Sequence, residues 1–379
     1  MRRDGRVAAD RQGPGSGLVS GDPPPLDLLR DADTFWAAVA TRLPDVARAL
    51  YARYPVVPRS YVEAYFLSFT RDHPGDPRAL LYLDSELGAP ARGTALLQAL
   101  GSVGVKVVGA RCLDIGCSNG GLLLAAAASG ARRCVGVEIS VERLESAHRL
   151  TQGRGIELVP LDVVREELPE GYGPFDVIFC FDVLEHVSSA AATLAFIKRH
   201  LQAGRRSFSF LSLFNPRHPD NVAAEPHYGV PGMILLPQDA ARELWTEVRG
   251  AFGSTLDYEV ADWTPYGALV DMLGRIGLTS SPFVDSLPVL DRSRPFWAGF
   301  RKRIADLEAR VADGVRGLGA RPASKELLLE SLRRYCGRYL QDHKAVSAGA
   351  RDEQLLALYL DYYSHTIQLV LRHAEPSAG

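Results

Sequence analysis

Acidic residues stand at the ends of three apolar, strand-like runs in the middle of the chain. Glu138 lies at the end of the first run, Asp162 follows the second and Asp182 follows the third. The runs are residues 135–139, 156–161 and 175–181. Because the carboxyl ends of parallel strands meet at one edge of a sheet, these carboxylates are expected to gather there. A carboxylate at that edge can accept hydrogen bonds from both hydroxyls of a ribose.

A glycine-rich turn precedes these acids. It lies in residues 111–121, which read RCLDIGCSNGG. The apolar residues before the turn predict a buried strand, and the good helix formers of residues 122–128 predict a helix after it. Gly116, Gly120 and Gly121 allow a sharp turn and let a ligand approach the backbone. A tight connection that binds nothing is the simpler interpretation of the glycines alone, but Glu138 at a later strand end weakens it.

Four motifs follow one another in the order of a known family. They are LDIGCSNG (113–120), VGVEIS (135–140), LDV (161–163) and FDVIFCFDVLEHV (175–187). With these motifs the chain resembles a class I S-adenosylmethionine-dependent methyltransferase. The resemblance covers residues 105–214 well and the flanking regions hardly at all. It implies a Rossmann-like α/β fold with a mostly parallel, seven-stranded sheet. Ser118 stands where the family often has a further glycine.

The resemblance implies a site for S-adenosyl-L-methionine at the turn and the strand ends. The glycine turn packs against the methionine and ribose portions, and Asp114 orders the turn and receives the amino-acid end. Glu138 takes the ribose hydroxyls, and Asp162 accepts from the adenine amino group. The implied cofactor residues are Asp114, Gly116, Cys117, Ser118, Gly120, Glu138, Ile139, Asp162, Val163 and Phe181. No metal ion is expected, since the cofactor already carries an activated methyl group.

A dinucleotide-dependent dehydrogenase is the main alternative with the same local features. It needs a Gly-x-Gly-x-x-Gly turn that approaches a pyrophosphate closely. Here Gly116 is followed by polar residues until Gly120, and Asp114 would face that anion. A cofactor that is cationic at sulfur and at its amine is instead favoured by nearby carboxylates. The charges of the turn therefore favour the methyltransferase.

The loop after the run 206–214 holds the candidate catalytic residues. It is long, rich in proline and placed at the carboxyl edge of the sheet, where a substrate pocket is expected. A hydroxyl acceptor must lose its proton as the methyl arrives, whereas a neutral amine attacks unaided. His227 is the first candidate base, because histidine titrates near neutral pH. His218, His186 and Asp182 are further candidates. Plain backbone hydrogen bonding is the alternative for these loop histidines.

Helical spacing of apolar residues frames the central region on both sides. We expect a mobile tail over residues 1–25, a helical cap over 26–104, the methyltransferase domain over 105–290 and a helical extension over 291–379. Within the cap, Tyr61 and Tyr65 are candidate substrate contacts, as is Tyr228 beside His227. The run 355–371 is apolar almost all round and is expected to form a helix that packs on its own chain or in a homodimer.

Composition limits the partners. The 43 basic and 45 acidic residues give a net charge of −2 without a basic stripe, so nucleic acid is not expected as a partner. No apolar run is long enough to span a membrane, and five cysteines without metal-ligand spacing indicate reduced thiols in the cytoplasm. We therefore expect O-methylation of a small molecule, in natural-product or glycan tailoring. A catalytically silent methyltransferase fold that serves assembly is the alternative.

Overall fold

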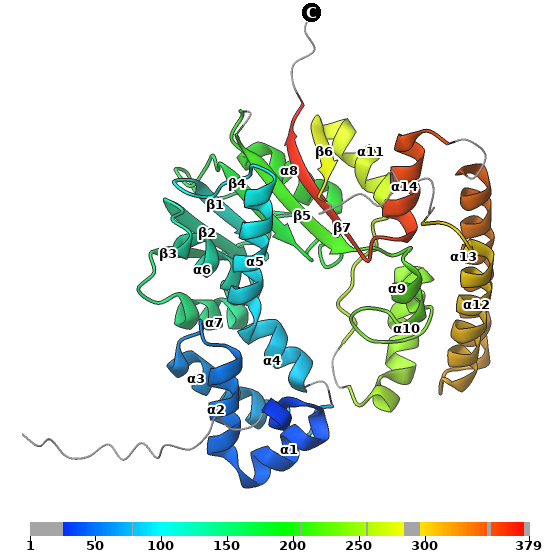
Figure 1. Ribbon diagram of the computed structural model, residues 1–379, viewed down its shortest axis with the longest axis horizontal. Coiled ribbons are helices and arrows are strands. Elements are labelled where there is room, and N and C mark those ends of the chain that lie inside the picture. Colours follow the sequence, from blue (N-terminus) through cyan, green and yellow to red (C-terminus); the bar gives the residue numbers. More distant parts are fainter. Residues whose placement is uncertain are drawn as a thin grey trace, which may run out of the picture.

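The molecule is built around one sheet with helical parts on two sides. The computed structural model describes residues 26–77, 79–204, 206–254, 257–283, 296–346 and 350–374. The tail expected over residues 1–25 therefore lies outside the described residues. Figure 1 shows the N-terminal helices (blue) below the sheet and the C-terminal helices (orange) to its right.

The sheet has seven strands in the order β3-β2-β1-β4-β5-β7-β6. The strands are β1 (Arg111–Ile115), β2 (Arg133–Glu138), β3 (Ile156–Pro160), β4 (Val177–Phe181), β5 (Phe208–Phe214), β6 (Leu278–Pro282) and β7 (Thr366–His373). β1 to β5 pair in parallel, and β7 pairs antiparallel with both β5 and β6. The predicted mostly parallel, seven-stranded sheet is confirmed.

Helices cover both faces of this sheet, which explains why its central strands are apolar throughout. Leu113 and Ile115 of β1 face a core shared with α8 (Ala190–His200) and α11 (Tyr266–Ile276). Cys112, the residue before Leu113, points the opposite way and faces the core on the other side. That second core includes side chains of α5 (Ala89–Ser102), α6 (Gly121–Ala128) and α7 (Val141–Thr151). Because successive side chains of a strand point to opposite faces of the sheet, β1 contributes to two separate cores.

The N-terminal helices have a core of their own. They are η1 (Leu26–Leu29), α1 (Ala32–Thr41), α2 (Leu43–Arg53), α3 (Arg59–Asp72) and α4 (Ala79–Leu87), followed by α5. Fully buried Phe35 and Leu50 centre this core, and Leu124 of α6 and Leu150 of α7 complete it. The N-terminal helices are therefore fastened to the helices that follow β1 and β2.

A second helical unit combines the segment after β5 with the C-terminal part of the chain. It contains α9 (Pro219–Ala223), η2 (Met233–Leu235), α10 (Gln238–Val248), η3 (Arg249–Phe252), α12 (Phe300–Gly317), α13 (Pro322–Val346) and α14 (Asp352–Tyr362). Buried Trp245 of α10 shares one apolar core with Val311 of α12 and Tyr339 of α13. Residues far apart in sequence thus form a single unit, which is called the helical lobe below.

The helix predicted over residues 355–371 is wrong in its second half. α14 ends at Tyr362, and residues 366–373 form β7 between β5 and β6. Ile367, Leu369 and Leu371 alternate toward the core beneath the sheet, a pattern that a short apolar run does not distinguish from a buried helix. The boundary expected at residue 290 therefore does not separate the C-terminal segment from the sheet. The apolar stretch also finds its partners within its own chain.

Two further findings bear on the environment of the protein. All five cysteines are free and buried. Among the described residues, no helix combines the length and the apolar character that a membrane crossing requires.

Candidate functional site

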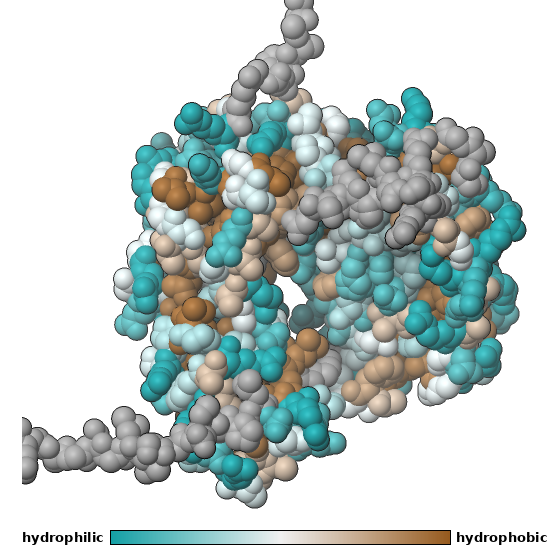
Figure 2. Space-filling view, viewed as in Figure 1, coloured by the Kyte–Doolittle hydropathy of each residue, from teal (hydrophilic) through white to brown (hydrophobic). Residues whose placement is uncertain are grey.

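A cleft of about 650 Å³ runs across the carboxyl ends of β1 to β4. Its lining includes Gly116 after β1, Glu138 at the end of β2, Asp162 after β3, and Asp182 and His186 after β4. The acids predicted to gather at one sheet edge therefore do so around a single hollow. In the space-filling view the molecule also has an opening at its centre, bordered by the N-terminal helices, the sheet and the helical lobe (Figure 2).

The carboxylate of Glu138 links the first two strand ends. One of its oxygens accepts from the backbone N–H of Ser118 at 3.1 Å, and the other accepts from that of Ser140 at 3.0 Å. Glu138 is 6% exposed, and Ser118 has a left-handed φ of 46°. Because each carboxylate oxygen has two lone pairs, both can still accept a hydroxyl of a ribose. The turn is thus preorganised around the group expected to bind the ribose.

Gly116 brings the turn close to the strand-end loop after β4. It has a φ of +66°, and a Cβ placed on it would lie 2.5 Å from a methyl group of Val183. Both residues line the cleft. Gly120 has a φ of +77° and is the N-cap residue directly before α6, but it does not belong to the lining. The glycines therefore serve two purposes, since Gly116 shapes the wall of the cleft and Gly120 turns the chain into a helix.

The residues expected at the adenine follow the second and third strands, with Ile139 after β2 and Asp162 and Val163 after β3. Asp162 is half-buried, and one of its oxygens accepts from the backbone N–H of Val164 at 2.9 Å. Val163 is buried beside it and Ile139 is 68% exposed. All three line the cleft. The exposed apolar side chain of Ile139 is the kind of surface that a stacked base would cover.

Five of the ten predicted cofactor residues do not line the cleft, namely Asp114, Cys117, Ser118, Gly120 and Phe181. Asp114 is buried beneath the turn, where burial, followed by the nearby charge of Glu138, raises the pKa of its carboxyl group. Cys117 is buried as well. Phe181 is 39% exposed and stacks on Phe210, outside the lining of the cleft. The structure therefore gives Asp114 and Cys117 indirect positions and does not bring Phe181 to the cleft.

Asp182 lines the cleft directly after β4 and has an uncommon backbone conformation. Its φ is +53°, which is sparsely populated for residues other than glycine, and such strain is common at functional sites. Ser212 donates its hydroxyl to Asp182 Oδ1 at 3.3 Å. Burial raises the pKa of Asp182 to about 6. The backbone of Asp182 is therefore held in the left-handed region, which residues other than glycine rarely adopt.

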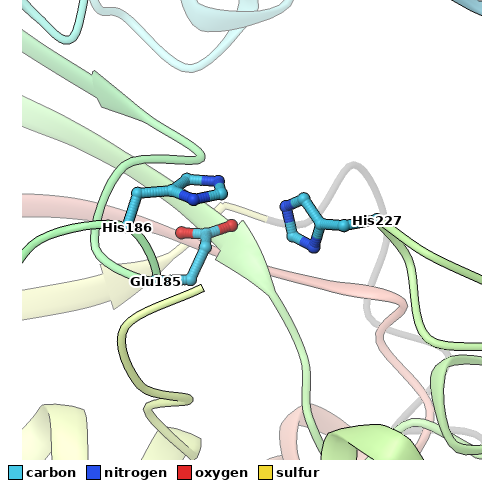
Figure 3. A group of neighbouring side chains, drawn as sticks. All are labelled: Glu185, His186 and His227. Atoms are coloured by element: carbon cyan, nitrogen blue, oxygen red, sulfur yellow. The ribbon is translucent and has the colours of Figure 1, made fainter. Parts of the chain in front are cut away.

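A cluster of acids and imidazoles adjoins Asp182. Glu185 and His186 come from the loop after β4, and His227 comes from the loop after β5 (Figure 3). The rings of His186 and His227 meet edge to face with centroids 4.8 Å apart. Burial, followed by the charge of Asp182, raises the pKa of Glu185 to about 7. One ligand atom from each of Glu185, His186 and His227 lies within 4.8 Å of the others, close enough to be drawn onto one metal ion.

His227 is oriented by Glu225. Its Nδ1 lies 2.9 Å from Glu225 Oε1, and Glu225 also accepts from the backbone N–H groups of His227 and Tyr228. Burial alone would lower the pKa of His227, but the hydrogen bond and charge of Glu225, with Glu185 and Asp182 nearby, raise it. The predicted base candidate therefore lies beside the cleft and is held by a fully buried carboxylate.

The remaining predicted residues lie elsewhere. His218 caps α9, accepting from the backbone N–H of Asp220 at 3.2 Å, and burial followed by the charge of His365 lowers its pKa to about 4. Tyr228 is buried, and its hydroxyl accepts from the N–H of Glu259 at 2.6 Å. Tyr61 and Tyr65 line a separate hollow of about 140 Å³ between α3 and α7. None of these four residues lines the cleft.

Sequence reasoning did not single out Arg143, Glu259 or Glu225. Arg143 and Glu259 line the cleft, whereas Glu225 supports it from within the protein. Only Glu225 had a usable signal, since it stands two positions before His227 in the same proline-rich loop. Glu259 reaches the cleft from the segment before α11, and no local pattern marks it.

Comparison with known proteins agrees with this geometry. Residues 89–251 match a family model described as a methyltransferase domain. The chain is 26% identical over 174 residues to the tRNA U34 carboxymethyltransferase of Cellvibrio japonicus, covering 45% of this chain and 52% of that protein. It is 34% identical over 106 residues to the ubiquinone biosynthesis O-methyltransferase of Xylella fastidiosa, covering 27% of this chain and 42% of that protein. The chain thus spans about half the length of the curated relatives it matches.

Solved structures give more distant likenesses. An S-adenosylmethionine-dependent methyltransferase from Mesorhizobium loti is 21% identical with a TM-score of 0.37, covering 48% of this chain and 81% of that one. A magnesium protoporphyrin IX methyltransferase from Synechocystis, solved with bound S-adenosylhomocysteine, is 19% identical with a TM-score of 0.34, covering 53% and 78%. With TM-scores this low, the two likenesses carry no argument about the chemistry of this chain.

Proposed function

Because this chain carries a class I S-adenosylmethionine-dependent methyltransferase domain, we propose that it transfers the cofactor's methyl group to a hydroxyl of a small molecule. The observation that carries this proposal is the cleft across the carboxyl ends of β1 to β4, with Glu138, Asp162 and Asp182 along it. An acidic cleft of about 650 Å³ fits a nucleoside that is cationic at its sulfur and its amine.

In this proposal the residues of the cleft bind and orient. Glu138 holds the ribose hydroxyls, Asp162 and Ile139 hold the adenine, and the turn at Gly116 closes against the remainder. Buried Asp114 supports the turn from below. When bound, the cofactor supplies a methyl group already activated on a sulfonium, so that positioning accounts for most of the catalysis.

The acceptor side is assigned to the cluster next to Asp182. A hydroxyl must give up its proton as its oxygen is methylated, and Asp182, His186 and His227 gather where that charge develops. His218 is left out of this role, because it points to His365 instead of the cleft. The position of these groups favours an oxygen acceptor over an amine, which needs no such assistance.

The choice of a small acceptor rests on charge and composition. A net charge of −2 does not favour a polyanion, although one relative is named for a tRNA substrate. Biosynthetic tailoring of a natural product or glycan fits an acceptor of this kind. The free, buried cysteines support a place in the cytoplasm.

The test uses the full chain with S-adenosylmethionine, S-adenosylhomocysteine and NAD in separate calorimetric titrations. The first two are expected to bind and NAD is not. Transfer of tritiated methyl groups into a fractionated small-molecule extract then identifies the acceptor. Binding of S-adenosylmethionine with no transfer to any fraction would favour a silent fold that serves assembly, and binding of NAD alone would favour a dehydrogenase.

The role of the cluster is tested by His227→Ala. We expect turnover to fall about 100-fold or more, while the affinity for S-adenosylmethionine changes less than about threefold, because the cofactor is held elsewhere. His148→Ala is the matched control, because His148 is an exposed residue of α7. Turnover of His227→Ala equal to that of the control would remove His227 from the site.

A further inference from the structure

We propose that Glu185, His186 and His227 bind one divalent transition-metal cation, which holds the hydroxyl of the acceptor for methylation. The inference rests on the proposed function and deepens it. It departs from the sequence-based expectation, which included no metal. With the cation bound, His227 acts as a ligand and the cation takes over the activation of the hydroxyl.

The first argument is that potential ligand atoms of the three side chains lie close together. One ligand atom from each side chain lies within 4.8 Å of the others, and Figure 3 shows the Glu185 carboxylate close to both imidazole rings. Ligand atoms that share an ion at about 2.1 Å are about 3 to 4 Å apart. Small rotations of the three side chains are therefore enough to close the site around a cation.

The second argument is the state of Glu185. Glu185 is 1% exposed, and neither of its carboxylate oxygens has a hydrogen-bond partner among the described residues. Buried carboxylates are normally paired or bound to a metal, because an isolated buried charge is costly. The two unpartnered oxygens belong to the same side chain that converges with the imidazoles.

The third argument is the orientation of both rings. His227 Nδ1 lies 2.9 Å from Glu225 Oε1, and His186 Nδ1 lies 3.3 Å from the carbonyl oxygen of Glu259. Each Nδ1 must donate to these acceptors, which leaves Nε2 with a free lone pair in the neutral ring. A carboxylate or a backbone carbonyl on the far nitrogen is the usual support of a metal-binding histidine.

The ligand set indicates which cations fit. Two imidazoles and one carboxylate suit Mn²⁺, Fe²⁺, Co²⁺ or Zn²⁺, whereas Mg²⁺ and Ca²⁺ prefer oxygen ligands alone. Three protein ligands leave coordination positions open for an oxygen of the substrate. Since His186 also lines the cofactor cleft, those positions adjoin the cleft. The matching acceptor is a small molecule with a hydroxyl, or two adjacent hydroxyls, that can coordinate a cation.

The chemistry balances without an oxidant or reductant. Coordination lowers the pKa of the acceptor hydroxyl, whose proton passes to solvent or to Asp182. The new bond joins the acceptor oxygen to the methyl carbon, and the bond from that carbon to sulfur breaks. The electron pair of the broken bond stays on sulfur, so the sulfonium becomes a neutral thioether.

The direct test titrates Co²⁺ and Zn²⁺ into the chelator-treated protein. We expect one ion per chain by calorimetry, and visible Co²⁺ absorption bands that change when the ligands change. Glu185→Gln, nearly identical in shape, is expected to weaken binding of Co²⁺ at least about tenfold. His200→Asn is the control, because His200 also pairs Nδ1 with a carbonyl and lies near a carboxylate, Glu167, but is not part of the Glu185, His186 and His227 cluster.

A second measurement separates this inference from the proposed function. Transfer from S-adenosylmethionine is expected to stop with chelator and to return with added metal, while cofactor binding persists throughout. Transfer that is unaffected by chelator, or Co²⁺ binding that Glu185→Gln does not change, overturns the metal site and leaves the methyltransferase in place. Retained S-adenosylmethionine affinity shows that Glu185→Gln is folded, and if this variant fails to fold, Glu225→Gln takes its place with a smaller expected loss of Co²⁺ affinity.

Discussion

At the scale of single residues, Glu138 combines two tasks that are usually separate. Its carboxylate holds the backbone of Ser118 and Ser140 in place and still faces the cleft. Loss of its charge therefore affects both the shape of the turn and the hydrogen bonds expected to the ribose.

We predict that Glu138→Gln weakens S-adenosylmethionine binding about 10- to 100-fold, because hydrogen bonds to a charged group contribute about 1.5 to 3 kcal/mol. Calorimetry measures the change. Glu145→Gln is the matched control, since Glu145 is an exposed residue on α7 outside the cleft. Equal affinities of the two variants would contradict the assignment of Glu138.

Gly116 can be tested against Gly130, another glycine with positive φ. The two have φ of +66° and +87°, but an added Cβ would lie 2.5 Å from Val183 at the first and 3.7 Å from Val108 at the second. Both alanine variants should lose about 1 to 2 kcal/mol of stability from backbone strain. Only Gly116→Ala is expected to lose cofactor affinity as well, by at least about tenfold. When Val183 is also changed to alanine, Gly116→Ala should reduce cofactor affinity less than it does in the native protein. An equal reduction in both backgrounds would contradict this account.

At the scale of elements, the helical lobe depends on a buried histidine between α13 and the turn after α14. His343 is fully buried, with Nδ1 2.7 Å from the carbonyl oxygen of Tyr339 and Nε2 2.8 Å from the hydroxyl of Tyr363. Burial lowers its pKa to about 4. The neutral imidazole is therefore part of the packing between these elements.

Acid is predicted to destabilise this unit. Because the pKa of His343 is lower in the folded state than its ordinary 6.5, the unfolded chain binds more protons between about pH 6.5 and 4. Its contribution is complete above that range and decreases as the pH falls, by about 2 kcal/mol at pH 5. Urea unfolding at pH 7.5 and 5 measures the loss. In His343→Gln the free energy of unfolding should differ less between the two pH values, by about 2 kcal/mol. An unchanged difference in free energy would contradict the prediction.

At the scale of the whole molecule, Asn215 joins segments that are far apart in sequence. It is fully buried at the end of β5, and its Nδ2 lies 2.8 Å from the carbonyl oxygen of Leu360 and 2.7 Å from that of Ser364. These carbonyls belong to the end of α14 and the turn into β7. One side chain thus ties the loop that carries His227 to the last strand of the sheet.

We expect Asn215→Ala to cost about 2 to 4 kcal/mol, because it leaves buried carbonyl groups without a donor. The variant should also become sensitive to proteolysis near residues 360–366. Limited digestion and urea midpoints measure the two effects. Gln354→Ala, which removes an exposed amide from the start of α14, should change stability by less than about 1 kcal/mol. A similar loss in both variants would show that Asn215 has no special role.

The amino-acid sequence by itself determined the class of the fold and the cofactor edge. Glycines at a strand-to-helix turn and acids at strand ends are local patterns, and parallel strands bring their carboxyl ends to one edge whatever surrounds them. Glu138, Asp162 and Gly116 therefore lie where the sequence predicted.

Only the tertiary structure decided the rest, since it depends on contacts between distant segments. A short apolar run does not reveal whether it meets a sheet or a helix, and so the strand at residues 366–373 was predicted as a helix. Spacing also does not reveal which polar groups meet. The approach of Glu185 and His186 to His227 therefore could not be predicted, nor could the positions of Tyr61, Tyr65 and Phe181 outside the lining of the cleft. Long-range packing positions these side chains, and it is set by the whole chain.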